Sequence, residues 1–61
     1  MKTYFVNGYD NGGRRVGEWF VADCGTEAME EFYNVYPNSY CVNVYEERGI
    51  ELVYLFSSGL F

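Results

Sequence analysis

The segment GYDNGGRR, residues 8–15, has the spacing of a phosphate-binding loop, because two glycines enclose four residues and two cations follow. Such a loop binds a nucleotide when a strand precedes it and a helix follows, since the amides of the helix N-terminus hold the phosphate. Here the next segment, residues 16–22, is rich in strand-forming residues. Arg14 and Arg15 also stand where the motif has Lys and then Ser or Thr. We therefore interpret this segment as a turn between two strands.

The remaining candidates for catalysis are a cysteine and paired carboxylates. The chain has no histidine, which removes the commonest general base and the commonest metal ligand. Cys24 precedes a predicted helix whose N-terminus would lower a thiol pKa, but only carboxylates could serve as its base. Glu30–Glu31 and Glu46–Glu47 are adjacent pairs, which point apart on a helix or a strand. We therefore expect no enzymatic activity, no cofactor and no metal site.

The segment TEAMEEFYNVYP, residues 26–37, predicts an amphipathic helix. Thr26 is a candidate N-cap, and Pro37 ends the helix because it cannot continue it. With 100° between successive residues, the apolar residues form one continuous arc centred on Ala28 and Phe32. The opposite side of the helix is polar and carries Glu27, Glu30, Glu31 and Asn34.

Two strand-like segments precede this helix and two follow it, at residues 3–9, 16–22, 40–46 and 50–56. The order ββαββ predicts an α+β fold of two layers, in which one helix packs on one face of a four-stranded, largely antiparallel sheet. We expect residues 1–61 to form a single domain with a thin core, and the order of the strands in the sheet stays open. Leu60 and Phe61 are expected to fold back onto the body of the domain.

One helix covers only one face of a sheet, so the other face is expected to be open. Polar residues mark the solvent side of three strands, namely Asn7, Glu18 and Asn43. Alternation along the strands places three aromatic residues on that side, Phe5, Phe20 and Tyr45. Because aromatic side chains are enriched in protein interfaces, we expect this face to be an interface. The alternative is that the rings shield one another within one subunit.

The net charge of −5, from nine acidic residues and four basic ones, argues against direct binding to nucleic acid. Such binding needs a cationic footprint on the protein. The apolar runs are far shorter than the roughly 20 residues of a membrane span, and the first residues do not form a secretory signal. We therefore expect no membrane association, a cytoplasmic location, and reduced thiols at Cys24 and Cys41.

Two functional hypotheses follow. In the first, the chain is a protein-binding module whose acidic surface binds the basic, nucleic-acid-binding surface of a partner. Its contact residues would be two groups of carboxylates, Glu27, Glu30 and Glu31 on the helix and Glu46, Glu47 and Glu51 around the second hairpin. The alternative interpretation of these charges is solubility alone. In the second hypothesis the chain is a homodimer joined through the open sheet face, either purely structural or holding a small ligand between the subunits.

The chain resembles the very small acidic proteins that phages and mobile elements encode against host defence enzymes, anti-CRISPR proteins among them. The shared features are size, charge, the lack of catalytic residues, and the ββαββ pattern carried by TYFVNGYDNGGRRVGEWFVA and TEAMEEFYNVYP. The resemblance implies an inhibitor that binds a partner protein. These families have no common motif, so no residue roles are carried over to this chain.

Overall fold

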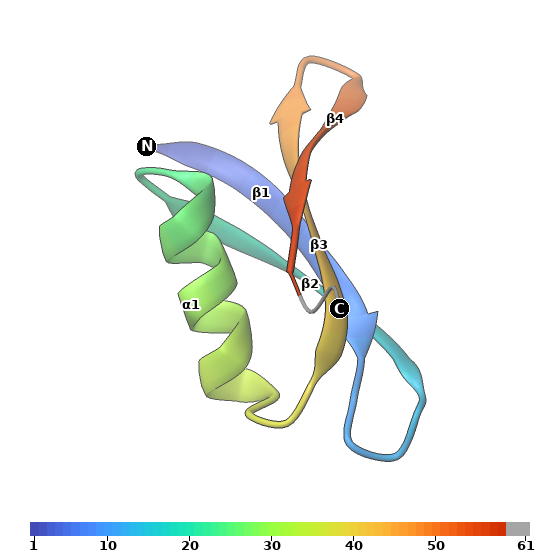
Figure 1. Ribbon diagram of the computed structural model, residues 1–61. Coiled ribbons are helices and arrows are strands. Elements are labelled where there is room, and N and C mark those ends of the chain that lie inside the picture. The colour runs from blue at the N-terminus through green and yellow to red at the C-terminus, as the bar shows by residue number, and fades with distance from the viewer. Residues whose placement is uncertain (59–61) are drawn as a thin grey trace.

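Four strands and one helix make up the computed structural model, which describes residues 1–58. In chain order the elements are β1 (Lys2–Tyr9), β2 (Arg15–Ala22), α1 (Gly25–Val35), β3 (Tyr40–Arg48) and β4 (Glu51–Ser57). Figure 1 shows α1 on one side of the sheet, with the opposite face uncovered by any other element. The predicted ββαββ order and the α+β class are confirmed. The expectation for Leu60 and Phe61 lies outside the described residues.

The strands form one sheet in the order β2-β1-β3-β4, and each neighbouring pair is antiparallel. β1 and β2 form one hairpin, and β3 and β4 form the other. Because β2 and β3 both run antiparallel to β1, they are parallel to each other, and α1 connects them across one face of the sheet.

The loop between β1 and β2 is a turn, as predicted. The Oδ1 atom of Asp10 accepts hydrogen bonds from the backbone N–H groups of Gly12 and Arg14, both at 2.9 Å. Gly13 has a φ of 83°, a left-handed conformation that glycine adopts without strain. The amides that a bound phosphate would need therefore already hold the chain's own carboxylate.

The helix starts two residues earlier than the predicted N-cap implied. It begins at Gly25 with Cys24 as the N-cap, and the prediction of Thr26 as the N-cap is wrong. The first turn packs closely on β4, since a Cβ atom at Gly25 would lie 3.0 Å from the ring of Phe56. The side chain of the N-cap residue Cys24 makes no capping hydrogen bond. Instead, the carboxylate of Glu27 accepts a hydrogen bond from the backbone N–H of Asp23 at 2.8 Å.

The core lies between α1 and the three strands β2, β1 and β3. Ala28 and Phe32 are completely buried, as the helical periodicity predicted. They pack on a cluster of sheet residues, Tyr4, Val6, Ala22, Val42 and Val44. Burying a side chain the size of Val or Phe contributes about 1.5–3 kcal/mol, so these contacts stabilise the two layers against each other.

The second hairpin differs from the predicted one in length and regularity. β3 continues to Arg48, so the turn falls at Gly49 and Ile50 and not at residues 46–49. In β4 the register shifts, because Tyr45 pairs with Tyr54 while Val44 pairs with Phe56. This β-bulge leaves one extra residue, Leu55, which packs toward the core together with Phe56.

Candidate functional site

The open face of the sheet carries a continuous line of aromatic side chains, one from each strand. In spatial order these are Trp19 of β2, Phe5 of β1, Tyr45 of β3 and Tyr54 of β4, which we call the aromatic row. The ring centroids lie 5.0 Å apart for Phe5 and Trp19, 6.4 Å for Phe5 and Tyr45, and 5.7 Å for Tyr45 and Tyr54. Aromatic rings at these separations attract one another, so the row forms one connected surface.

The two ends of the aromatic row remain exposed to solvent. Trp19 and Tyr54 are each 54% exposed, whereas Phe5 and Tyr45 in the middle are partly covered by their neighbours. Two aliphatic residues of the same face extend the apolar surface at its ends, Val21 at 58% exposed and Leu52 at 46%. Contiguous apolar surface of this kind marks interaction sites in small domains.

A line of polar side chains runs beside the aromatic row. The Nδ2 group of Asn43 donates to Oδ1 of Asn7 at 3.1 Å, and the hydroxyl of Ser57 donates to Oδ1 of Asn43 at 2.7 Å. The Tyr54 hydroxyl is hydrogen-bonded to the hydroxyl of Ser57 in turn. A partner could cover these bonded atoms without leaving them unpaired, whereas the Nδ2 group of Asn7 donates no hydrogen bond within residues 1–58.

The prediction that Phe20 lies on the open face is wrong. Its Cα partner is the buried Tyr4, and its ring packs edge-on against Phe32 of the helix, with centroids 6.4 Å apart. The error came from Glu18, which was used as a marker of solvent. Glu18 lies on the helix side, where its Oε2 atom accepts a hydrogen bond from the hydroxyl of Tyr36 at 2.9 Å. Phe5 and Tyr45 do lie on the open face.

Sequence reasoning missed the two exposed ends of the aromatic row. Alternation in β2 places Trp19 on the face opposite to Glu18, so taking Glu18 as the marker of the solvent side excluded Trp19 from the open face. Alternation gives no face for Tyr54, because both sides of the fourth strand are apolar. The large size of the tryptophan was the one available signal, because a thin core under a single helix has little room for it.

The carboxylates of the helix point away from the sheet. Glu27 and Glu30 are exposed and Glu31 is half-buried, on the side of α1 opposite to Ala28 and Phe32. We call these three residues the helix strip. Within residues 1–58 none of them forms an ion pair, because both ion pairs there involve Glu46.

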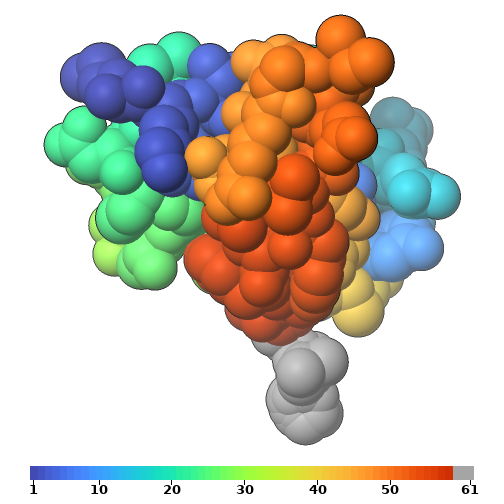
Figure 2. Space-filling view, turned by 90° about the horizontal axis from the view of Figure 1, so that it is seen from above, coloured from blue at the N-terminus to red at the C-terminus, as the bar shows by residue number. Residues whose placement is uncertain are grey.

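Glu46 is not available to a partner, contrary to its predicted role. The residue is 7% exposed, and its carboxylate contacts Nζ of Lys2 at 3.3 Å and Nη2 of Arg48 at 2.9 Å. Figure 2 looks onto this end of the molecule, where the first residues (blue) lie against the β3–β4 hairpin (orange). The Arg48 guanidinium, helped by Lys2 and opposed by burial, holds the pKa of Glu46 below its ordinary value.

The other two acids of the second hairpin are exposed, but on different sides of the strands. Glu47 pairs with Leu52 and therefore lies on the open face, whereas Glu51 pairs with Arg48 at the hairpin end. The hairpin and α1 occupy different parts of the molecule (Figure 1). The structure therefore does not gather the six predicted carboxylates into one surface.

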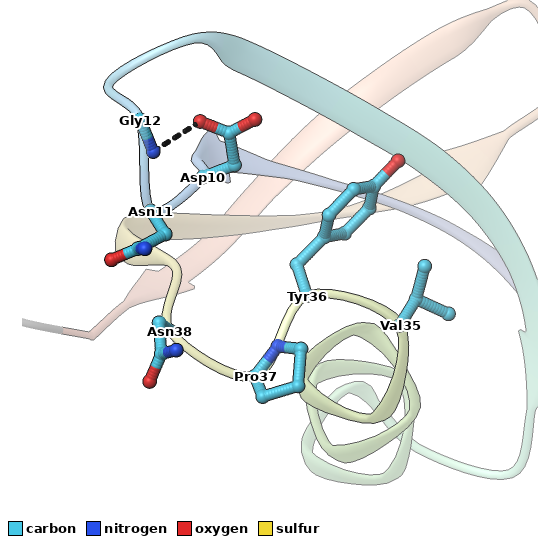
Figure 3. Close-up of a pocket in the computed structure, with 7 residues that line it drawn as sticks. All are labelled: Asp10, Asn11, Gly12, Val35, Tyr36, Pro37 and Asn38. Carbon is cyan, nitrogen blue, oxygen red and sulfur yellow. Dashed lines mark hydrogen bonds between the residues drawn. The ribbon is translucent and has the colours of Figure 1, made fainter.

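One pocket lies between the β1–β2 loop and the end of the helix (Figure 3). It has a volume of about 200 Å³ and is lined by Asp10, Asn11, Gly12, Val35, Tyr36, Pro37 and Asn38. Small-molecule sites usually measure about 300–1,000 Å³, so this pocket is below that range. In Figure 3 the carboxylate of Asp10 is turned to the amide of Gly12, so part of its polar lining is already bound within the loop.

Residues 1–58 contain no cluster of three or more side chains suited to hold a metal ion. Cys24 and Cys41 are both exposed, free thiols. Within the same residues, α1 is too short and too polar to cross a membrane. Comparisons of the chain with known protein families, with curated proteins and with solved structures found no match.

Proposed function

We propose that the chain is a small, non-catalytic module that binds a basic protein surface through the helix strip. The observation that supports this most is the distribution of charge. Lys2 and Arg48 both form ion pairs with Glu46, so they do not neutralise the carboxylates of Glu27, Glu30 and Glu31. The remaining cations, Arg14 and Arg15, lie together at the β1–β2 hairpin.

A convex acidic strip attracts surfaces that themselves bind phosphates. Grooves rich in Lys and Arg concentrate anions, and complementary charge speeds the encounter of two proteins. A module of this kind competes with nucleic acid for the groove and so inhibits the partner. Inhibition by occupation is also what the resemblance to phage-encoded inhibitors of defence enzymes implies.

The experiment is affinity capture of basic proteins on the immobilised chain, followed by identification and by competition with duplex nucleic acid. The test variant is Glu30→Lys with Glu31→Lys. Glu27 is left intact because it holds the N–H of Asp23 at the start of the helix, and its reversal would confuse loss of contact with loss of structure. We expect the captured protein to be released by salt and by nucleic acid, and to be lost in the test variant.

The matched control reverses two exposed acids away from the helix, Glu47→Lys with Glu51→Lys. Both double variants change the net charge by the same amount, so an effect of charge alone weakens capture equally in the two. Equal loss, or loss in the control only, contradicts the helix strip as the contact. Loss in the test variant with retention in the control supports it.

The homodimer expected as the alternative concerns the opposite face of the sheet and is compatible with this function, because a dimer formed there presents one helix strip on each outer side. A small ligand held between the subunits has less support. Most polar atoms of the side chains of Asn7, Asn43 and Ser57 on that face are already hydrogen-bonded to one another.

A further inference from the structure

We infer that the open face of the sheet binds a second copy of this chain, with the aromatic row at the centre of a two-fold interface. This inference does not rest on the proposed function, since the helix strip lies on the other side of the sheet. It rests on three properties of the face: its charge, its hydrogen bonding and its size.

The lack of charge at the centre of the open face favours a second copy of this chain over a basic partner. The centre of the face, around Phe5 and Tyr45, carries aromatic and amide side chains and no charged residue, although the chain as a whole has a net charge of −5. Two such chains repel each other when their acidic sides meet, and this face is where the repulsion is least. A basic partner, in contrast, gains little from a surface without carboxylates at its centre.

The two ends of the open face carry opposite charges. Alternation puts Arg15 on this face at the start of β2, and Glu47 on this face at the far end of β3. A two-fold axis along the aromatic row turns the second copy end over end. The end bearing Glu47 in one copy then lies over the end bearing Arg15 in the other, so the arrangement is self-complementary.

Hydrogen bonding on the face tolerates burial. Asn7, Asn43, Ser57 and the hydroxyl of Tyr54 form one chain of hydrogen bonds within the subunit. Burying a polar group is costly only when it loses its partner, so a second sheet can cover the bonded atoms of this line without that cost. The Nδ2 group of Asn7 donates no hydrogen bond within residues 1–58 and would need an acceptor from the second copy.

The size of the face is sufficient for a dimer that dissociates on dilution. Four strands about 4.8 Å apart and about eight residues long, at about 3.3 Å per residue, present a face of roughly 500 Å² in projection. Two copies therefore bury about 1,000 Å², which reaches the minimum for a biological interface and is below the roughly 1,200–2,000 Å² of standard ones. Sheets that pack face to face in this way interdigitate the side chains of their inner faces, as the protruding rings of Trp19 and Tyr54 allow.

The experiment measures mass by analytical ultracentrifugation and the emission of Trp19 over a dilution series of the full chain. The chain mass is 7.1 kDa, and Trp19 is its only tryptophan. We expect twice the chain mass at high concentration. On dilution the mass should halve, and the emission of Trp19 should shift to longer wavelength over the same range, because a ring that is 54% exposed in one subunit is covered in the dimer. A mass of one chain at every concentration overturns the inference.

The test variant is Trp19→Thr with Tyr54→Thr, which removes the exposed ends of the row and keeps strand-forming residues. The matched control is Val35→Thr with Ile50→Thr, two exposed apolar residues outside the face. Tryptophan and tyrosine often carry much of the binding at interfaces, and these two rings are the most exposed of the row. We therefore expect the dissociation constant to rise by about 100-fold in the test variant and little in the control. A dimer that persists in the test variant, or is lost equally in the control, overturns the inference. Circular dichroism checks that both variants are folded, and the dilution series of the unmodified chain decides the matter if one is not.

Discussion

The ring of Phe5 lies against the backbone of Gly17, so that a Cβ atom at position 17 would be only 2.6 Å from the Cζ atom of Phe5. The two residues lie on neighbouring strands, and each is diagonal to the other, because Phe5 pairs with Trp19 and Gly17 pairs with Asn7. Because Gly17 has no side chain, the ring of Phe5 can lie over its backbone. In this position the centroid of the Phe5 ring is 5.0 Å from that of Trp19. Gly17 is therefore part of how the aromatic row is built.

Gly17→Ala is the first prediction. Replacing glycine by alanine usually stabilises a protein by about 0.4–1 kcal/mol when the backbone permits it. Here the new Cβ displaces the ring of Phe5, and overpacking costs about 1–3 kcal/mol, so we expect a net loss of about 1 kcal/mol. The measurement is urea unfolding at fixed protein concentration. In a Phe5→Ala background the same change should instead stabilise the protein, and a gain in the unmodified background would contradict the prediction.

Cys41 gives the second prediction, because its backbone has a conformation that favours glycine. It has a φ of 54° within β3, next to the point where the register between β1 and β3 shifts. The left-handed region costs a residue with a Cβ roughly 1–2 kcal/mol, so we expect Cys41→Gly to recover about 1 kcal/mol in chemical unfolding. Cys41→Val should lose stability, because a branched side chain suits that region worst.

Cys41→Ala is the control for this prediction, since it removes the thiol without relieving the backbone. Its free energy of unfolding should stay close to that of the unmodified chain. If alanine stabilises as much as glycine, the gain comes from losing the exposed thiol, and the argument from φ is wrong.

The sequence was sufficient for the elements and for the centre of the core. Ala28 and Phe32 are buried because helical periodicity is a local property, and Pro37 ends the helix for a local reason. The order β2-β1-β3-β4 could not be predicted, because strand pairing depends on contacts between distant segments. The helix start was missed by two residues, since Gly25 lies where the helix packs closely on β4 and no capping side chain marks it.

The candidate site was harder to predict, because assigning a face depends on which polar residues have partners. In the sequence, Glu18 indicated the solvent side of its strand. In the structure it lies on the helix side, because the hydroxyl of Tyr36 donates a hydrogen bond to its carboxylate. The sequence predicted an exposed Glu46 in the second hairpin. In the structure it is buried, because Lys2 and Arg48 both form ion pairs with its carboxylate. In β4 the bulge at Leu55 breaks the alternation, so no period-two pattern could assign its faces.

Glu46 gives the third prediction, a dependence of stability on pH. The hydrogen bond from Arg48 is the main reason that the pKa of Glu46 lies below its ordinary value of 4.5. A carboxylate whose pKa is lowered by folding stabilises the protein fully above its unfolded pKa, and this contribution is lost as the pH falls through the folded pKa. We expect Glu46→Gln to be destabilising at neutral pH, and the difference from the unmodified chain to shrink as the pH falls below 4.5.

The measurement is chemical unfolding of both proteins at a series of pH values from neutral to acidic. Glu47→Gln is the matched control, because it is the next residue in β3 but is exposed on the other face. Its difference from the unmodified chain should vary less over the same range. A difference for Glu46→Gln that is constant with pH would show that the ion pairs with Lys2 and Arg48 do not contribute.

Tyr36 and Glu18 give the fourth prediction, which tests the contact that fixes the face of β2. The Tyr36 hydroxyl donates to the Glu18 carboxylate at 2.9 Å, and this bond is the main reason that the pKa of Tyr36 lies above its ordinary value of 10.0. Tyr36→Phe leaves the half-buried carboxylate without its donor and should destabilise the protein. Glu18→Gln should cost less, because an amide oxygen still accepts from the hydroxyl.

The double variant distinguishes this contact from two independent losses. If the bond between Tyr36 and Glu18 is real, the double variant should lose less than the sum of the two single variants, whereas additive losses would contradict the contact. A tyrosine whose pKa is raised by folding stabilises the protein below its unfolded pKa, and this contribution is lost as the pH rises through the folded pKa. The stability of the unmodified chain should therefore fall more steeply above pH 10.0 than that of Tyr36→Phe. Equal slopes would mean that the Tyr36 hydroxyl is not hydrogen-bonded to Glu18 in solution.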